Sequence, residues 1–484
     1  MSQLPDTAID AIARQVLQRM QAGGTGPTLA PAAAESVARG GSLPSGVYRS
    51  IDECVTAAAA AFRDMKKLGL EKRQAIIASI RESMSTHAVS LAREAHEETG
   101  LGRADDKVIK NRLVTRKTQG PEVLVPRAET GDHGLTLMEW APYGVIGSIT
   151  PTTNPTSTII CNTIGMVAAG NVVVFNVHPN AKRVSCRNVG LINEAIQKAG
   201  GPPNVVTAMA DPTIESAQEL MKHRGVRLLV VTGGPGVVKA AMASGKRAVC
   251  AGPGNPPVVV DESADLDRAG RDIVRGASFD NNVICTDEKE VFVVQPVADR
   301  LLKVMGEHGA VVLTEPQARA LTKVIFEETR GPRKPGVINR KWIGKNAGVI
   351  LEQIGLRVPD SVRLAVMDVE VDHPLIWTEQ LMPVLPVARV RNADEAIDLA
   401  VAAEHGFGHS AAMHSLHLGN LSRMAREINC SIFVKNAPIY AGLGEGGEGY
   451  TSFSIASPTG EGLTGPLTFS RQRRCVLVDH FRIV

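Results

Sequence analysis

One segment of this 484-residue chain combines residue types that favour nucleophilic chemistry. It reads SFDNNVICTDEKE, with Cys285 after a polar, turn-like run and just before a predicted strand. A catalytic cysteine needs access and a lowered thiol pKa, and turns at the ends of elements supply both. The alternative is a buried structural cysteine, which is the usual fate of a free thiol. Asp280, Asn281 and Asn282 suit a core strand poorly, so they favour a catalytic Cys285.

Two further segments contain groups that could stabilise negative charge. SITPTTNPTST ends a predicted strand, where open α/β sheets bind ligands, and Asn154 in it could donate a hydrogen bond to an oxyanion. The segment could equally be a simple connecting turn. VVTGGPGVVKAAM predicts a strand, a glycine-rich turn and a helix start, whose free backbone N–H groups favour an anion. Because it has neither GxGxxG nor the GK[ST] of a P-loop, this motif alone is weak evidence.

Other common kinds of site are not indicated. The twelve histidines form no HExxH or HxH pattern, which argues against a metal site. His405 and His409 enclose a glycine-rich stretch and could be either structural or basic. The absence of GxSxG argues against an α/β-hydrolase. The seven cysteines include no CxxC pair, so we expect neither a disulfide framework nor a zinc knuckle, and a reducing compartment fits best.

The composition is that of an ordinary globular protein. Lys+Arg number 53 and Asp+Glu 50, a formal net charge of +3, and aromatic residues make up only 4%. Neither a basic field nor base stacking is therefore expected to hold a nucleic acid. No apolar stretch is long enough to cross a bilayer, and no secretory signal pattern is visible. We expect a cytosolic protein that binds neither nucleic acid nor membrane.

Hydrophobic spacing divides the chain into regions. Residues 6–20 predict a short amphipathic helix, and the Gly, Ala, Pro and Ser of 21–46 predict a flexible linker. Residues 51–115 predict helices. From about residue 144, strand-like runs alternate with helical stretches, which predicts a mostly parallel sheet covered by helices. The strand candidates are GVIGSIT, NVVVFNV, NVVTAMA, VRLLVVTGG, PPVVVDE, KEVFVV, MPVLPVARV, CSIFVKNA and RRCVLVDHFRIV.

Six segments in this order resemble the CoA-acylating branch of the aldehyde dehydrogenase superfamily. They are ITPTTNPTST, FNVHPNA, TGGPGVV, GPGNPP followed by ADLD, FDNNVICTDEKE and EQLMPVLP. The resemblance runs from about residue 48 to the end, and it is greatest to the propionaldehyde and acetaldehyde dehydrogenases of bacterial microcompartments.

The resemblance implies an α/β fold with two large domains and a small β oligomerisation element. The dinucleotide-binding domain would span 47–260, with an oligomerisation hairpin near 120–143, and the catalytic domain would span 261–465. Residues 466–484 would add a C-terminal oligomerisation strand. Members of the superfamily form dimers or tetramers, so a homo-oligomer is expected.

The resemblance also implies roles for individual residues. Cys285 matches the catalytic nucleophile. In gapless matching Thr153 stands at the position of the catalytic asparagine and Asn154 one place later, and we favour Asn154 because its amide can donate. The implied NAD site contains Thr152, His178, Pro179, Thr232, Gly233 and Glu379. Among these, His178 replaces the lysine that usually holds the adenosine ribose, which leaves NAD against NADP open.

One departure from the family pattern bears on the product. Hydrolytic members carry a glutamate in a segment reading ELGGKNP, whereas the matching segment here reads CAGPGNP, with Cys250 at the glutamate position. Without that base to activate water, a thioacyl enzyme would survive until a coenzyme A thiolate attacks it. The resemblance therefore implies oxidation of a short aldehyde to its acyl-CoA with NAD and coenzyme A.

The substrate and the cellular setting follow from the same resemblance. Propionaldehyde is the first expectation and acetaldehyde the alternative, since one methylene discriminates only about 10–200-fold. Residues 6–20 resemble an encapsulation peptide that binds microcompartment shell or cargo proteins, so we expect the enzyme inside a bacterial microcompartment. Competing readings are a non-acylating aldehyde dehydrogenase, a gamma-glutamyl phosphate reductase or related acyl-phosphate reductase, and a catalytically inert scaffold.

Overall fold

The region predicted to be helical forms three consecutive helices in the computed structural model, which describes residues 43–484. They are α2 (Ile51–Met65), α3 (Leu70–Thr99) and α4 (Ala104–Lys117). Ser50 begins α2 with a capping box, and Gly100 ends α3 at a left-handed φ of 64°. The predicted helix at 6–20 and most of the predicted linker at 21–46 lie outside the described residues.

The first sheet is parallel and is built from short apolar strands. In spatial order these are β1 (Val47–Tyr48), β6 (Val206–Met209), β5 (Val172–Asn176), β4 (Val145–Ile149), β7 (Leu228–Thr232) and β8 (Ala248–Ala251). After β4 the chain moves outward through β5 to β6 and then returns to β7 on the other side of β4. The loops after β4 and β7 therefore diverge and open a crevice at the carboxyl ends of the strands.

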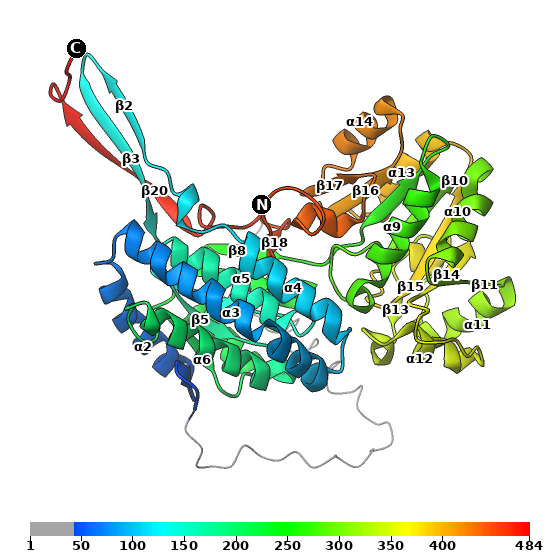
Figure 1. The fold of residues 1–484 in the computed structure, drawn as a ribbon, viewed down its shortest axis with the longest axis horizontal. Coiled ribbons are helices and arrows are strands. Elements are labelled where there is room, and N and C mark those ends of the chain that lie inside the picture. The colour runs from blue at the N-terminus through cyan, green and yellow to red at the C-terminus, as the bar shows by residue number, and fades with distance from the viewer. Residues whose placement is uncertain (1–42) are drawn as a thin grey trace, which may run out of the picture. The chain divides into compact units, whose positions relative to one another are not determined.

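Helices cover both faces of this sheet (Figure 1). α5 (Pro155–Ala168) and α6 (Lys182–Lys198) lie on one face beneath α3 and α4, and α2 lies with α7 (Ile214–Lys222) on the other. Every residue of α5 is buried, because the helix lies between the sheet and this second helical layer. α8 (Pro235–Met242) follows β7 directly. The sequence prediction of a parallel sheet covered by helices is confirmed.

The second sheet is also parallel. Its order is β11 (Ala310–Leu313), β14 (Leu364–Val369), β15 (Val384–Val390), β10 (Glu290–Val294), β9 (Pro257–Val260), β16 (Ser410–His414) and β17 (Ile432–Lys435). Its helices are α9 (Leu266–Ser278), α10 (Gln295–Glu307), α11 (Glu315–Ile325), α12 (Ala347–Leu351), α13 (Ala393–Ala403) and α14 (Leu418–Glu427). Two short antiparallel pairs complete the fold, β12 (Phe326–Glu328) with β13 (Val337–Ile338) and β18 (Ile455–Ala456) with β19 (Gly462–Leu463).

The change from one sheet to the other differs from the predicted boundaries. β9 pairs with β10 and β16, so the chain enters the second sheet before Pro257 rather than after Val260. It returns to the first sheet before residue 465, because the Phe453 N–H donates to Cys161 Sγ on α5 and β18 lies against β8. An apolar run predicts a buried strand, but it does not reveal which of two parallel sheets the strand joins.

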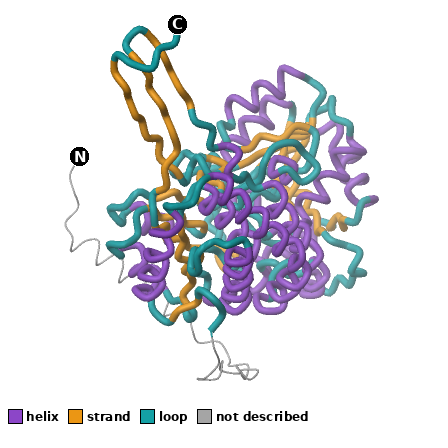
Figure 2. Tube along the Cα trace, turned by 60° about the vertical axis from the view of Figure 1, so that its left-hand side comes forward, coloured by secondary structure: helices purple, strands orange, loops and turns teal. Residues whose placement is uncertain are grey.

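A separate antiparallel sheet extends away from both parallel sheets (Figures 1 and 2). It pairs the hairpin of β2 (Arg127–Gly131) and β3 (Gly134–Pro142) with β20 (Ser470–Val478), from Ser470 opposite Pro142 to Val478 opposite Gly134. We call these three strands the arm. Its surface and the chain beyond β20 expose the apolar side chains Val476, Leu477, Val478 and Phe481.

Among residues 43–484, no helix combines the length and the hydropathy needed to cross a membrane.

Candidate active site

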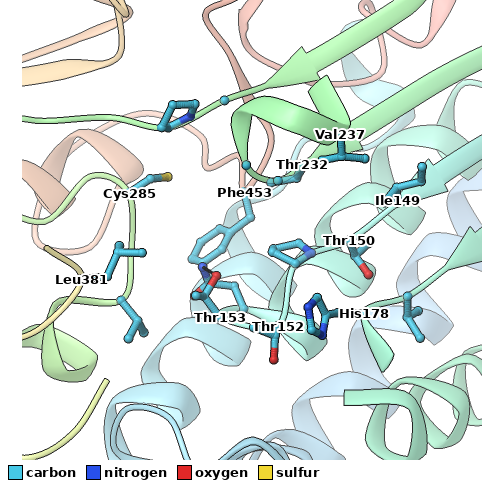
Figure 3. Close-up of a pocket in the computed structure, with 18 of the residues that line it drawn as sticks. Ile149, Thr150, Thr152, Thr153, His178, Thr232, Val237, Cys285, Leu381 and Phe453 are labelled. Atoms are coloured by element: carbon cyan, nitrogen blue, oxygen red, sulfur yellow. Dashed lines mark hydrogen bonds between the residues drawn. The ribbon is translucent and has the colours of Figure 1, made fainter. Parts of the chain in front are cut away.

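A cavity of about 670 Å³ lies at the carboxyl ends of the first sheet and is bordered on the other side by loops of the second sheet (Figure 3). It is where the crevice between β4 and β7 is expected from the topology. The structure brings together here all the residues that the sequence predicted for the site, which are Cys285, Asn154, Thr152, His178, Pro179, Thr232, Gly233 and Glu379. The alternative position for the amide donor, Thr153, also lines the cavity.

The part of the cavity next to the first sheet suits a dinucleotide. The hydroxyls of Thr150 and Thr152, directly after β4, are buried and have no hydrogen-bond partner within the described part of the chain. Across the crevice, Gly233 and Gly234 lead into α8, and a Cβ added to Gly234 would meet no atom within 4 Å. Free hydroxyls opposite an open helix N-terminus fit a diphosphate and its ribose groups.

His178 occupies the end of β5 and contributes a neutral ring. Its Nδ1 accepts a hydrogen bond of 3.2 Å from the Asn180 N–H, and burial lowers the pKa of the imidazole below its usual value. A neutral imidazole can hydrogen-bond a ribose hydroxyl but offers no charge to a ribose phosphate.

Cys285 lies in a turn that left-handed residues build. Asp280, Asn281 and Asn282 have φ values of 47°, 55° and 64°, a region that Asn and Asp tolerate better than other side chains. This explains why the sequence departs from a core strand at these positions. Lys289 holds the turn, since its Nζ donates to Asn282 Oδ1 at 2.6 Å and to the Ile284 carbonyl at 3.1 Å.

The electrostatic environment of Cys285 is opposite to what the sequence predicted. The pKa of the thiol is raised to about 12, mainly by burial and also by the carboxylates of Glu379 and Asp287, while Lys289 opposes them. Among residues 43–484, Glu379 is the one carboxylate residue that lines the cavity, and its Oε1 accepts a hydrogen bond of 3.3 Å from the Gly254 N–H. Without ligands the nucleophile is therefore a thiol rather than a thiolate.

Asn154 presents an amide to the same cavity. It precedes α5, and its Oδ1 accepts a hydrogen bond of 2.6 Å from Lys110 Nζ, while its Nδ2 donates to Thr153 Oγ1 at 3.2 Å. One Nδ2 hydrogen remains for a ligand. The geometry can therefore offer an N–H donor to an oxyanion that forms next to Cys285.

Cys250 lies outside the cavity wall. Its side chain is fully buried in β8, and burial raises the pKa of the thiol to about 11. Only Gly252 and Pro253, which follow it, reach the cavity. The position that carries a glutamate in hydrolytic relatives therefore supplies no base here.

The buried residues that support the turn before Cys285 were not identified by the sequence analysis. Lys107 and Lys110 are buried on α4 and donate to Asp280 Oδ2. Their spacing places them on one helix face, but a lysine pair alone predicts only a solvated surface. His409, one of the two histidines noted in the sequence, is buried next to Gly254 with its Nε2 unpartnered in the described structure.

Within residues 43–484, no three His, Cys, Asp or Glu side chains lie close enough together to hold a metal ion.

Known proteins are similar to this chain over most of its length. The aldehyde dehydrogenase family model matches residues 20–454. The acetylating acetaldehyde dehydrogenase of Salmonella typhimurium is 52% identical over 91% of this chain and 94% of its own.

Two solved structures are also similar. The propionaldehyde dehydrogenase of the Clostridium phytofermentans fucose utilisation microcompartment superposes with a TM-score of 0.88, at 45% identity over 91% of this chain and all of its own. The Rhodopseudomonas palustris propionaldehyde dehydrogenase, solved with bound CoA and an acylated cysteine, gives a TM-score of 0.87 at 46% identity over 90% of this chain and 98% of its own.

The raised thiol pKa predicts how Cys285 reacts with iodoacetamide. Alkylation of the ligand-free protein should be slow at pH 7 and should keep rising to pH 9.5 without a plateau. Glu379→Gln removes a carboxylate that raises the pKa and should speed alkylation at pH 8 by about 3- to 10-fold, because each unit of pKa changes the thiolate fraction tenfold. Peptide mass mapping follows Cys285, and Glu370→Gln, the same change at an exposed position, is the control. Equal rates in both variants would contradict the assigned effect of Glu379.

Proposed function

Because this chain belongs to the aldehyde dehydrogenase family, we propose that it oxidises a short-chain aldehyde to the acyl-CoA, with NAD and coenzyme A, through a thioester on Cys285. One observation carries the proposal. Cys285 and Asn154 line the same cavity as the residues at the carboxyl ends of the first sheet, while the position of the hydrolytic base holds the buried Cys250. The relatives that share about half of the sequence are CoA-acylating enzymes.

The proposed reaction has two halves, formation of a thioester on Cys285 and transfer of its acyl group to coenzyme A. The Cys285 thiol loses its proton to solvent water and its sulfur attacks the aldehyde carbon. The oxyanion of the resulting thiohemiacetal accepts a hydrogen bond from Asn154 Nδ2. Thr150, Thr152, His178 and Gly233 would hold NAD in the crevice, where its chemistry would be that of a hydride acceptor for this carbon. Cys285 is then a thioester. The sulfur of coenzyme A attacks the acyl carbon, the Cys285 thiolate leaves, and the acyl-CoA departs.

Hydrophobic side chains share the cavity wall with Cys285 and suit a short acyl chain. Val283, Ile284, Leu381 and Phe453 line the cavity together with Cys285 (Figure 3). The relatives act on acetaldehyde or on propionaldehyde. We propose a substrate of two or three carbons, with propionaldehyde the first expectation from the sequence.

The arm and the N-terminal segment give the proposed protein partners. We propose a dimer or tetramer in which the arm of one copy packs on another, because β20 and the chain beyond it expose Val476, Val478 and Phe481. We also propose that residues 6–20 bind shell or cargo proteins of a microcompartment in the bacterial cytoplasm. This rests on the amphipathic pattern of the segment and on the microcompartment origin of a similar structure.

Replacing the nucleophile tests the proposed function directly. Cys285→Ala should lower CoA-dependent NADH and acyl-CoA formation by about 10⁴-fold or more, because no other group can hold the acyl chain. Cys430→Ala, which changes a cysteine outside the cavity wall, should keep most of the activity. Omission of coenzyme A from the wild-type assay should prevent sustained turnover. Sustained production of free acid without coenzyme A would instead support a non-acylating enzyme.

Aldehyde length tests the proposed substrate class. Steady-state kcat/KM for propionaldehyde and acetaldehyde should differ by about 10- to 200-fold at most, since they differ by one methylene. Both values should exceed that for butyraldehyde. A higher kcat/KM for butyraldehyde than for either shorter aldehyde would rule out a C2–C3 enzyme.

Removing residues 1–20 tests the proposed encapsulation segment. The truncated enzyme should keep its kcat, because the residues that line the cavity within the described range 43–484 all lie between 101 and 455. A fluorescent fusion of the full chain should colocalise with shells, and the truncated fusion should be dispersed. Colocalisation of the truncated fusion would show that another surface directs encapsulation.

A further inference from the structure

Lys110 connects two parts of the proposed active site that lie far apart in the sequence. Its side chain is buried on α4, and its ammonium donates to Asn154 Oδ1 at 2.6 Å and to Asp280 Oδ2. Asn154 faces the cavity, and Asp280 lies in the turn that leads to Cys285. One side chain thus contacts both the oxyanion donor and the support of the nucleophile.

The contact with Oδ1 determines which end of the Asn154 amide faces the cavity. An amide has an acceptor oxygen and a donor nitrogen of nearly the same shape, so its partners decide its orientation. An ammonium has only donors, and it therefore requires Oδ1 on the Lys110 side. The Nδ2 group then lies at the other end, with one hydrogen on Thr153 Oγ1 and one free. A flipped amide would place two donors against each other and turn a carbonyl toward the oxyanion.

The charge of Lys110 is balanced within the same group of residues. Asp280 is fully buried, and it also accepts from Lys107 Nζ at 2.9 Å and from the Arg103 N–H at 2.7 Å. Loss of Lys110 would therefore leave Asp280 with another cation. Besides Asp280, the Lys107 ammonium donates to the Thr153 carbonyl at 3.4 Å. Within the described residues it makes no hydrogen bond to the Asn154 amide. The two lysines lie on the same helix, are both buried and both donate to Asp280. They differ in that Lys110 alone also donates to the Asn154 amide.

We propose that Lys110 is a positioning residue that fixes and polarises the Asn154 amide, so that Nδ2–H points to the oxyanion of the thiohemiacetal. The proposal rests on the proposed function, in which Asn154 is the oxyanion donor. Lys110 acts only through that amide and does not touch the aldehyde.

A double-mutant cycle tests this inference, with Lys107→Met as the matched control. Asn154→Ala should lower the rate of hydride transfer by about 10²–10³-fold, the usual effect of losing one oxyanion donor. Lys110→Met should lower it by about 10²-fold through misplacement of the amide, with little change in the KM for NAD. In the Asn154→Ala background, Lys110→Met should cost less than about twofold, because the group it acts on is gone. Lys107→Met removes the other ammonium from Asp280 but leaves the contact of Lys110 with the Asn154 amide, so its loss should be smaller than that of Lys110→Met and equal in the two backgrounds.

The outcomes separate this inference from the proposed function. Equal losses from Lys110→Met in both backgrounds, or equal losses from Lys107→Met and Lys110→Met, would overturn the positioning role alone. Wild-type rates in Asn154→Ala would overturn the oxyanion assignment and this inference together, whereas acyl-CoA formation by Cys285→Ala would overturn the thioester mechanism.

A more conservative substitution at Lys110 controls for a loss of activity that is caused by misfolding. Lys110→Gln retains a neutral donor for Oδ1, so its rate of hydride transfer should be at least tenfold higher than that of Lys110→Met. If Lys110→Met does not fold, the same cycle is run with Lys110→Gln, and failure of both variants to fold would show a structural role instead.

Discussion

The buried carboxylate of Asp280 is the constraint on which the candidate site depends. A carboxylate without solvent is stable only if cations and N–H groups surround it, and loss of a partner from such a pair costs about 3–5 kcal/mol. Lys107, Lys110 and the Arg103 N–H supply these partners from the beginning of α4. They hold the pKa of Asp280 below its usual value, while burial lowers the pKa of Lys107 to about 8. The position of α4 relative to the Cys285 turn follows from the need to pair the Asp280 carboxylate with these cations and N–H groups.

The same interaction joins the two sheets at the nucleophile. α4 belongs to the helical layer of the first sheet, whereas Asp280 begins the turn that leads through Cys285 into β10 of the second sheet. The left-handed backbone at Asp280 and Asn281 is disfavoured by itself, and the hydrogen bonds from Arg103 offset this cost. Strain at this turn is thus compensated by contacts with Arg103, and Lys110 connects Asp280 in the same turn with Asn154.

Much of this arrangement could be predicted from the sequence, for reasons that are local. Runs such as NVVVFNV are short, apolar and rich in β-branched residues, so they predict buried parallel strands. The Cys285 segment was identified because Asp280 and Asn281 contradict a core strand, and the structure explains both by their left-handed φ values. The sheet to which β9 belongs could not be predicted, since its composition suits either sheet equally.

The parts that escaped prediction depend on contacts across long sequence separations. No spacing rule connects Lys110 with a carboxylate 170 residues away, so the lysine pair on α4 gave no functional signal. The sign of the Cys285 pKa shift was predicted wrongly for the same reason. A turn next to a strand predicts access, but the burial and the Glu379 carboxylate that raise the pKa come from the tertiary packing of other segments.

The resting state of the nucleophile and the absence of a hydrolytic base lead to the same chemistry. Burial and the nearby Glu379 carboxylate favour the neutral thiol of Cys285 in the ligand-free protein. Once the thioester has formed, water needs a carboxylate to activate it, and position 250 offers only a buried thiol. Glu379 already accepts the Gly254 N–H and lies where it opposes ionisation of sulfur. A sulfur nucleophile is far more reactive toward thioesters than neutral water, so a site built this way transfers the acyl group to a thiol before hydrolysis competes.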